Sequence, residues 1–191
     1  MRQANILTLS KALQHLRGHT LNSFENFSSA NKLTLPYHKG LNPPVWELGH
    51  IAWFQEHWIA RNLQRSHGLA CDLSQPRKAS LLSEADAWFD SAKVAHSTRW
   101  ELKRLTSPMC IQYAKESLAQ TLALLHNETD HSPSLYFYWL VLQHEAMHLE
   151  ASAYMAQSLS IPFKALWQQA AAIAENSQPR AFKLNQQSVE Y

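Results

Sequence analysis

The chain is poor in glycine, and this limits the folds that it can adopt. Only 4 glycines occur among 191 residues, which disfavours a β-rich fold with many tight turns. No segment shows the alternation of apolar and polar residues that is typical of a half-buried strand. Apolar residues recur instead at helical spacing, so the sequence predicts helices separated by loops that contain proline and serine.

This spacing predicts four long helices and some shorter ones. The four cover Leu7–Phe27, Asn42 to about Arg65 with Gly68 as its cap, about Met109–Glu128, and Asp130 to about Ser160. A short helix or turn should end at Phe89, and a last helix should cover Phe163–Glu175. We therefore predict an all-α fold, a four-helix bundle with a long crossover between helices two and three. Residues 1–175 should form the domain and residues 176–191 a polar tail or linker remnant.

Composition and charge exclude several classes of function. The net charge is +2 with neutral histidines, and no block of lysine and arginine suggests a nucleic-acid partner. Cys71 and Cys110 lie far apart and form neither a CxxC unit nor a disulfide framework, which favours a reducing cytoplasm. No apolar run reaches the length of about 18 residues that indicates a membrane span.

Two histidines four residues apart stand in a long apolar run. On a helix His144 and His148 lie about 40° apart, on a face that also carries Phe137, Leu140, Val141, Ala151 and Met155. Both imidazoles should therefore point into the bundle, about one turn apart, as two ligands of one metal ion would. The alternative is a pair of core histidines satisfied by hydrogen bonds.

The carboxylates beside this pair are poor candidates for a third ligand. Glu150 lies about 140° from the midpoint of the two histidines, so we predict that it stands behind the ligands or on the surface. Glu145 lies about 80° away and should either orient a ligand imidazole or be solvated. Residues 144–148 also match the HExxH motif of zinc peptidases, but neither a further downstream ligand nor the zincin sheet has a counterpart here.

His50 is the best candidate for the third ligand. It follows Gly49, whose missing side chain permits close approach of a neighbouring helix, and shares a face with Trp46, Glu47, Trp53 and Phe54. His57 returns to that face about 10 Å further along the axis, too far to share the ion. His15 and His19 also have i, i+4 spacing, but their face is polar and no metal site is expected there.

Three segments of the chain resemble the sulfoxide synthases of ergothioneine biosynthesis. They are the stretch from Asn42 to Glu56, the stretch from Ala85 to Trp100, and the element His144-x3-His148-x-Glu150. The resemblance implies a DinB-like four-helix bundle with a mononuclear non-haem Fe(II) held by His50, His144 and His148. In that family the iron binds a thiol substrate and O2, and sulfur is joined to an imidazole carbon as a sulfoxide. Three imidazoles alone do not select a metal, so zinc and nickel stay open.

The resemblance also indicates substrate-binding residues and a partner. Lys93 and Arg99 are candidates for binding a carboxylate of the thiol substrate, and His96 lies between them. Met147 stands where some members have a glutamine that touches the histidine-derived substrate. Family members carry a second domain similar to formylglycine-generating enzymes, which supplies a catalytic tyrosine. We expect a partner subunit to provide it, since the sequence reaches Tyr191 about where that domain begins; no catalytic residue is assigned within this chain.

Three functions follow from these features. The chain is the iron-binding half of a split sulfoxide synthase, a stand-alone DinB-like metalloprotein such as a thiol-dependent transferase, or a truncated, non-catalytic domain. DinB-like bundles often pair, and aromatic residues such as Trp58 and Trp167 would allow a homodimer if they are exposed; the alternative is that they belong to the core.

Overall fold

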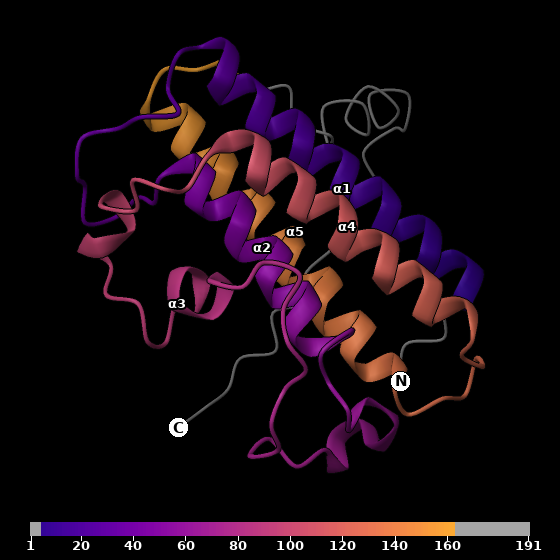
Figure 1. Ribbon diagram of the computed structural model, residues 1–191. Helices are drawn as coiled ribbons and strands as arrows, with labels where there is room; N and C mark the ends of the chain where they lie inside the picture. The colour runs from indigo at the N-terminus through magenta and orange to yellow at the C-terminus, as the bar shows by residue number, and fades with distance from the viewer. Residues whose placement is uncertain (1–4, 163–191) are drawn as a thin grey trace, which may run out of the picture.

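Four long helices form a bundle in the computed structural model, which describes residues 5–162 (Figure 1). They are α1 (Ile6–Ser29), α2 (Pro44–Trp58), α4 (Ser107–His126) and α5 (Leu135–Ser158). α2 packs mainly against α4, and α1 packs mainly against α5. The crossover between α2 and α4 contains η1 (Arg65–Ala70), α3 (Ala85–Phe89) and η2 (Ser97–Trp100). Residues 5–162 contain no strand, so the predicted all-α bundle with its long crossover is confirmed.

Most helix ends lie close to their predicted positions. Asn5 caps α1 by accepting a hydrogen bond from the Thr8 amide at 2.8 Å, and prolines stand in the first turns of α2 and α4, where their missing N–H groups cost nothing. α4 begins and ends two residues before its predicted bounds. The predicted last helix Phe163–Glu175, with Trp167, and the tail 176–191 lie outside the described residues.

The predicted end of α2 at Arg65 is wrong, because the helix stops at Trp58. Tertiary hydrogen bonds turn the chain there: Arg61 pairs with Asp86 and donates to the carbonyl of Lys78, while Arg65 donates to the carbonyl of Ile59. Gly68 does not cap α2 either. It lies within η1 at a φ of 53°, and a Cβ atom there would stand 2.7 Å from a backbone oxygen of Pro133.

The largest apolar cluster joins α2, α3 and α4, and it includes Trp46, Leu48, Trp53, Phe89 and Tyr113. Gly49 makes this packing feasible, because a Cβ atom there would lie only 2.2 Å from the Phe89 ring. The close approach predicted at Gly49 is therefore confirmed, and α3 is the element that approaches. α3 thereby comes to lie against the middle of α2, beside His50.

A buried ion pair ties α5 to α1. The Arg17 Nε atom lies 2.7 Å from Glu145 Oε1, and both side chains are 2% exposed. Arg17 also donates to Gln55 of α2 and to the Ala114 carbonyl of α4, and Thr20 donates to Glu145. A buried charge is tolerated only when it is paired and hydrogen-bonded, so this network fixes which face of α5 turns toward α1. No helix within residues 5–162 is long and apolar enough to cross a membrane.

Candidate metal centre

The three predicted histidines meet between α2 and α5. His50 comes from α2, His144 and His148 come from α5, and one donor nitrogen of each lies within 4.8 Å of the others. The Nε2 atoms of His144 and His148 are 3.2 Å apart. A metal ion bonded to nitrogen at about 2.0–2.1 Å requires donor atoms roughly 3.0–3.4 Å apart. One pair already has this spacing, and a small movement of His50 would complete a set of three.

His50 is held with one specific nitrogen free. Its Nδ1 lies 2.8 Å from the backbone carbonyl of Phe89, and a carbonyl can only accept, so Nδ1 carries the proton. The Nε2 atom is therefore unprotonated and keeps the lone pair that a metal requires. The Trp46 ring stacks on the imidazole, with centroids 4.8 Å apart and an interplanar angle of 9°. α3 thus fixes both the protonation and the orientation of His50.

His148 is oriented by a carboxylate. Its Nδ1 lies 2.7 Å from Glu47 Oε2, and Asn42 donates to the other oxygen of Glu47 at 2.6 Å. Burial alone would raise the pKa of Glu47, but the hydrogen bonds from His148 and Asn42 outweigh it and lower that pKa. Glu47 is thus an anion that accepts a hydrogen bond from Nδ1–H of His148, which leaves Nε2 of His148 free for a metal. This role was missed in the sequence, although Glu47 lies three residues before His50 on the same face.

His144 is held mainly by stacking. Its ring lies 3.6 Å from the Phe54 ring, centroid to centroid, at an angle of 5°. Burial, together with His148 and His50, lowers the pKa of His144 to about 2, and burial lowers that of His50 to about 4. Both imidazoles are therefore neutral near pH 7, as metal binding requires.

Arg99 contacts residues that support the histidines. Its guanidinium stands 4.0 Å above the Trp46 ring and donates to Asn42 at 2.7 Å. Through Trp46 it supports His50, and through Asn42 and Glu47 it supports His148. One guanidinium nitrogen donates to Asn42, while Nε has no hydrogen-bond partner among the described residues, so binding of a substrate carboxylate by Arg99 stays a prediction.

The other predicted substrate residues are more exposed. Lys93 is 79% exposed and pairs with Asp90 at 2.9 Å. Met147 is 56% exposed, on the outer side of α5. His96 donates to, and is held by, the carbonyl of Leu41 at 2.8 Å. Lys93 and Met147 remain predictions as contact points for a substrate.

The two carboxylates of α5 have different places. Glu150 is exposed and accepts a hydrogen bond from Tyr154 at 3.3 Å, in agreement with a position outside the ligand set. Glu145 neither orients an imidazole nor faces solvent, contrary to both expectations, because its oxygens bind Arg17 and Thr20. The buried guanidinium of α1, far away in the sequence, is the reason.

One cavity reaches two of the three histidines, and another reaches Glu47. One of about 390 Å³ reaches His50 and His144, and its walls include Trp53, Trp58 and Lys93. Another of about 310 Å³ is lined by Glu47, by His96 and by residues of the 39–42 loop and α5. The first gives a small molecule direct access to the histidines.

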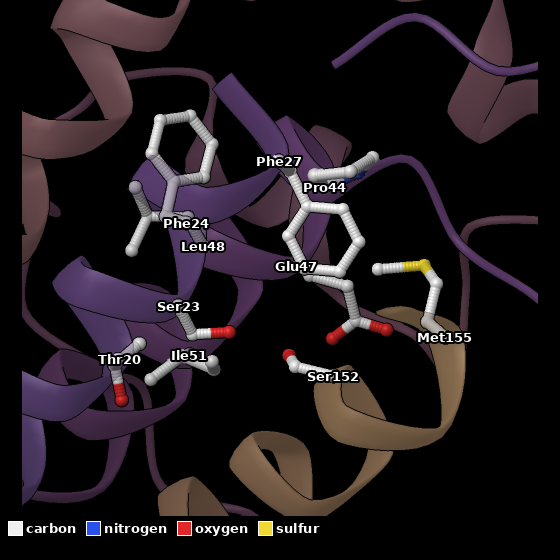
Figure 2. A pocket seen from close by; sticks show the side chains of 10 residues that line it. All are labelled: Thr20, Ser23, Phe24, Phe27, Pro44, Glu47, Leu48, Ile51, Ser152 and Met155. Atoms are coloured by element: carbon white, nitrogen blue, oxygen red, sulfur yellow. The ribbon is translucent and has the colours of Figure 1, made fainter. Parts of the chain in front are cut away.

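A smaller cavity lies behind Glu47, between α1, α2 and α5. Its volume is about 20 Å³, about the size that accommodates one water molecule. Figure 2 shows the side chains of Ser23, Glu47 and Ser152 pointing into it from three different helices. The Ser23 hydroxyl has no hydrogen-bond partner among the described residues. Two serine hydroxyls therefore share this mainly apolar cavity with the Glu47 carboxylate.

The remaining histidines lie apart from this centre. His15 and His19 lie 3.0 Å apart, Nε2 to Nε2, on the outer face of α1, and within residues 5–162 no third metal-binding side chain joins them. His57 lines the cavity of about 390 Å³, and its Nε2 accepts a hydrogen bond from Arg77 at 3.3 Å.

Comparison with known families agrees with the fold. A model of the DinB superfamily matches residues 12–152, which is more than half of the 191 residues and includes all three histidines. The chain therefore belongs to the DinB superfamily. A search for similar curated proteins found no match.

Proposed function

We propose that the chain binds a mononuclear non-haem Fe(II) through His50, His144 and His148, as part of an enzyme of the sulfoxide synthase type. One observation carries this proposal: the three segments that resemble the synthases converge on one site. The segment 42–56 supplies His50 and Glu47, the segment 85–100 supplies the Phe89 carbonyl, and α5 supplies the other two histidines.

The reaction that this proposal implies is a four-electron oxidation. A thiol R–SH and an imidazole C–H react with O2 to give the sulfoxide R–S(=O)–C and one water molecule. An iron ion held by three neutral imidazoles would supply open positions for a thiol and O2 and the redox capacity for this step. The chain itself holds the imidazoles by Glu47 and the Phe89 carbonyl, and its aromatic walls limit the access of water.

Exposed apolar side chains on the outer face of α5 favour a second domain that covers the site. Tyr136, Met147 and Tyr154 are 42%, 56% and 65% exposed on this helix, which also carries His144 and His148. Large exposed apolar side chains beside a functional site are typical of an interaction surface. A domain similar to formylglycine-generating enzymes, supplied by a partner subunit, would cover this face and complete the pocket for the histidine-derived substrate.

Metal analysis of protein purified anaerobically tests the first part of the proposal. We expect one iron per chain and an electron paramagnetic resonance signal of the Fe(II)–nitric oxide adduct, both lost in His148→Ala and retained in His15→Ala. Tightly bound zinc or nickel in place of iron would favour the stand-alone transferase, and a chain that binds no metal would overturn the proposal.

A second assay tests the reaction. The iron-loaded chain is mixed with a partner-domain protein, a thiol, a histidine derivative and O2, and the sulfoxide is sought by mass spectrometry. Product that disappears with His50→Ala is the expected result. Failure with every candidate partner, despite bound iron, would contradict C–S bond formation but leave the metal site intact.

A further inference from the structure

Ser23 of α1 is a buried serine whose hydroxyl does not bond to its own helix. The residue is 4% exposed, and the hydroxyl has no hydrogen-bond partner among the described residues. A serine or threonine within a helix can donate to the carbonyl four residues earlier, as Thr20 does to Leu16 and Ser152 does to His148. The Ser23 hydroxyl points instead into the cavity of about 20 Å³ between α1, α2 and α5 (Figure 2). Leaving a buried hydroxyl unbonded is costly, so this orientation calls for a partner within the cavity.

Glu47 and Ser152 present free acceptor positions to the same cavity. The Glu47 oxygens each accept one hydrogen bond, Oε1 from Asn42 and Oε2 from His148, and a carboxylate oxygen can accept a second. The Ser152 hydroxyl donates to the His148 carbonyl at 3.0 Å and keeps its lone pairs as acceptors. The cavity therefore combines one unused donor, on Ser23, with unused acceptors on Glu47 and Ser152.

One water molecule would satisfy this set of donors and acceptors. Its oxygen would accept from Ser23, and its two hydrogens would bond to Glu47 and Ser152, which gives the number of hydrogen bonds, about three, that is typical of a buried water. The volume of about 20 Å³ suits a single water molecule. A calcium ion does not fit, since it takes about six to eight oxygen ligands, whereas apolar side chains such as Phe27 and Met155 form most of the walls.

We propose that Ser23 binds one water molecule in this cavity and, through it, positions the Glu47 carboxylate against His148. Glu47 comes from α2 and His148 from α5, and their contact of 2.7 Å joins these two helices. A water molecule held by Ser23 braces that contact from a third helix, α1, because it adds a bond that limits rotation of the carboxylate. The water site stands on the cavity and its polar groups alone; its effect on metal affinity rests on the proposed metal function.

A crystal structure of the metal-free protein, at a resolution that shows ordered solvent, tests the water site directly. The wild type should contain one ordered water within hydrogen-bonding distance of Ser23, Glu47 and Ser152. A cavity that contains no ordered solvent, or a Ser23 hydroxyl that bonds back to the carbonyl of His19, would overturn the proposal. This measurement requires neither a variant nor a bound metal.

Titration with Co(II) tests the positioning role of Ser23. Ser23→Ala should weaken Co(II) binding by about three- to tenfold, less than the loss of about 10–100-fold that removal of a group directly behind a ligand causes. Ser29→Ala, which changes an exposed serine of the same helix, should leave the affinity unchanged. In the Glu47→Gln background Ser23→Ala should have little further effect, because the two residues act through one contact.

The resonance of the His148 Nδ1–H proton gives a readout that loss of stability alone would not move. In the metal-free protein this proton reports the hydrogen bond to Glu47, so its chemical shift should change in Ser23→Ala and stay unchanged in Ser29→Ala. Ser23→Cys, which keeps the shape of the side chain but is a much weaker donor, replaces Ser23→Ala if the latter does not fold by circular dichroism.

The outcomes separate the role of Ser23 from the metal function. Equal Co(II) affinity in Ser23→Ala and the wild type, or an undiminished loss in the Glu47→Gln background, would overturn the positioning role. Absence of Co(II) binding by the wild type would overturn the proposed metal function. In that case the crystal structure and the His148 proton resonance of the metal-free protein would still decide whether Ser23 holds a water against Glu47.

Discussion

The same histidine spacing occurs on two helices with different consequences. On α5 the rings of His144 and His148 lie 4.4 Å apart with Nε2 atoms at 3.2 Å; on α1 the rings of His15 and His19 lie 4.3 Å apart with Nε2 atoms at 3.0 Å. The pair on α5 meets His50, Glu47 and Phe54, whereas the pair on α1 faces outward. Local helix geometry therefore makes a pair of donors, and tertiary packing makes a candidate metal centre.

A substitution of Arg17 should have the largest effect on stability. Arg17 lies on α1, the helix of the exposed pair, but its ion pair holds α5, the helix of the buried pair. Arg17→Met leaves Glu145 charged and unpaired inside the bundle, so the free energy of unfolding should fall by about 3–5 kcal/mol. Chemical denaturation of the metal-free protein measures it, with Lys11→Met, an exposed change on α1, as the control. The double variant Arg17→Met/Glu145→Leu should recover most of the loss. A cost below about 1 kcal/mol for the single change would mean that the pair does not anchor α5.

Removing one histidine from each pair should affect metal affinity in only one of the two cases. His148→Ala should weaken Co(II) binding by more than about 100-fold, since loss of a partner behind a ligand already costs 10–100-fold. His19→Ala, the same change in the exposed pair, should leave the affinity unchanged. Competition with a chelating dye measures both. Equal losses in the two variants would show that the sites are not distinguished by packing.

The α5 histidines could be predicted from periodicity, because both repeat with the apolar face of one helix. His50 and Gly49 were also predictable, since a small residue before a histidine in an aromatic stretch indicates close packing. The partners in the buried ion pair between α1 and α5 could not be predicted, because Arg17 and Glu145 are separated by 128 positions. A charged residue within the apolar stripe of α1 was the available signal. The end of α2 was missed for a similar reason, since bonds from Arg61 and Arg65 to distant or later groups override local helix propensity.

Glu47 provides the next test, because the pair on α1 has no equivalent of it. Glu47→Gln keeps the size of the side chain but removes the negative charge of the group that accepts the hydrogen bond from His148. Co(II) affinity should fall by about 10–100-fold. Glu150→Gln, an exposed carboxylate two residues after His148, is the matched control and should bind as the wild type. The role of Glu47 is refuted when the two variants bind equally well.

The smallest expected effect concerns how the stability of the metal-free protein depends on pH. Buried and exposed histidines should again differ in their contribution. The folded-state pKa of His50 is about 4, below the ordinary histidine value of 6.5, so the unfolded chain binds more protons between these two values. Stability of the metal-free protein should therefore be complete above about pH 6.5 and fall as the pH drops toward 4. His50→Gln should reduce this slope by up to about 1.4 kcal/mol per pH unit, while His15→Gln, on the exposed face of α1, should leave it unchanged. Denaturation at a series of pH values measures the slopes. If both variants keep the wild-type slope, burial does not hold His50 neutral, and the free lone pair assigned to its Nε2 atom would need another explanation.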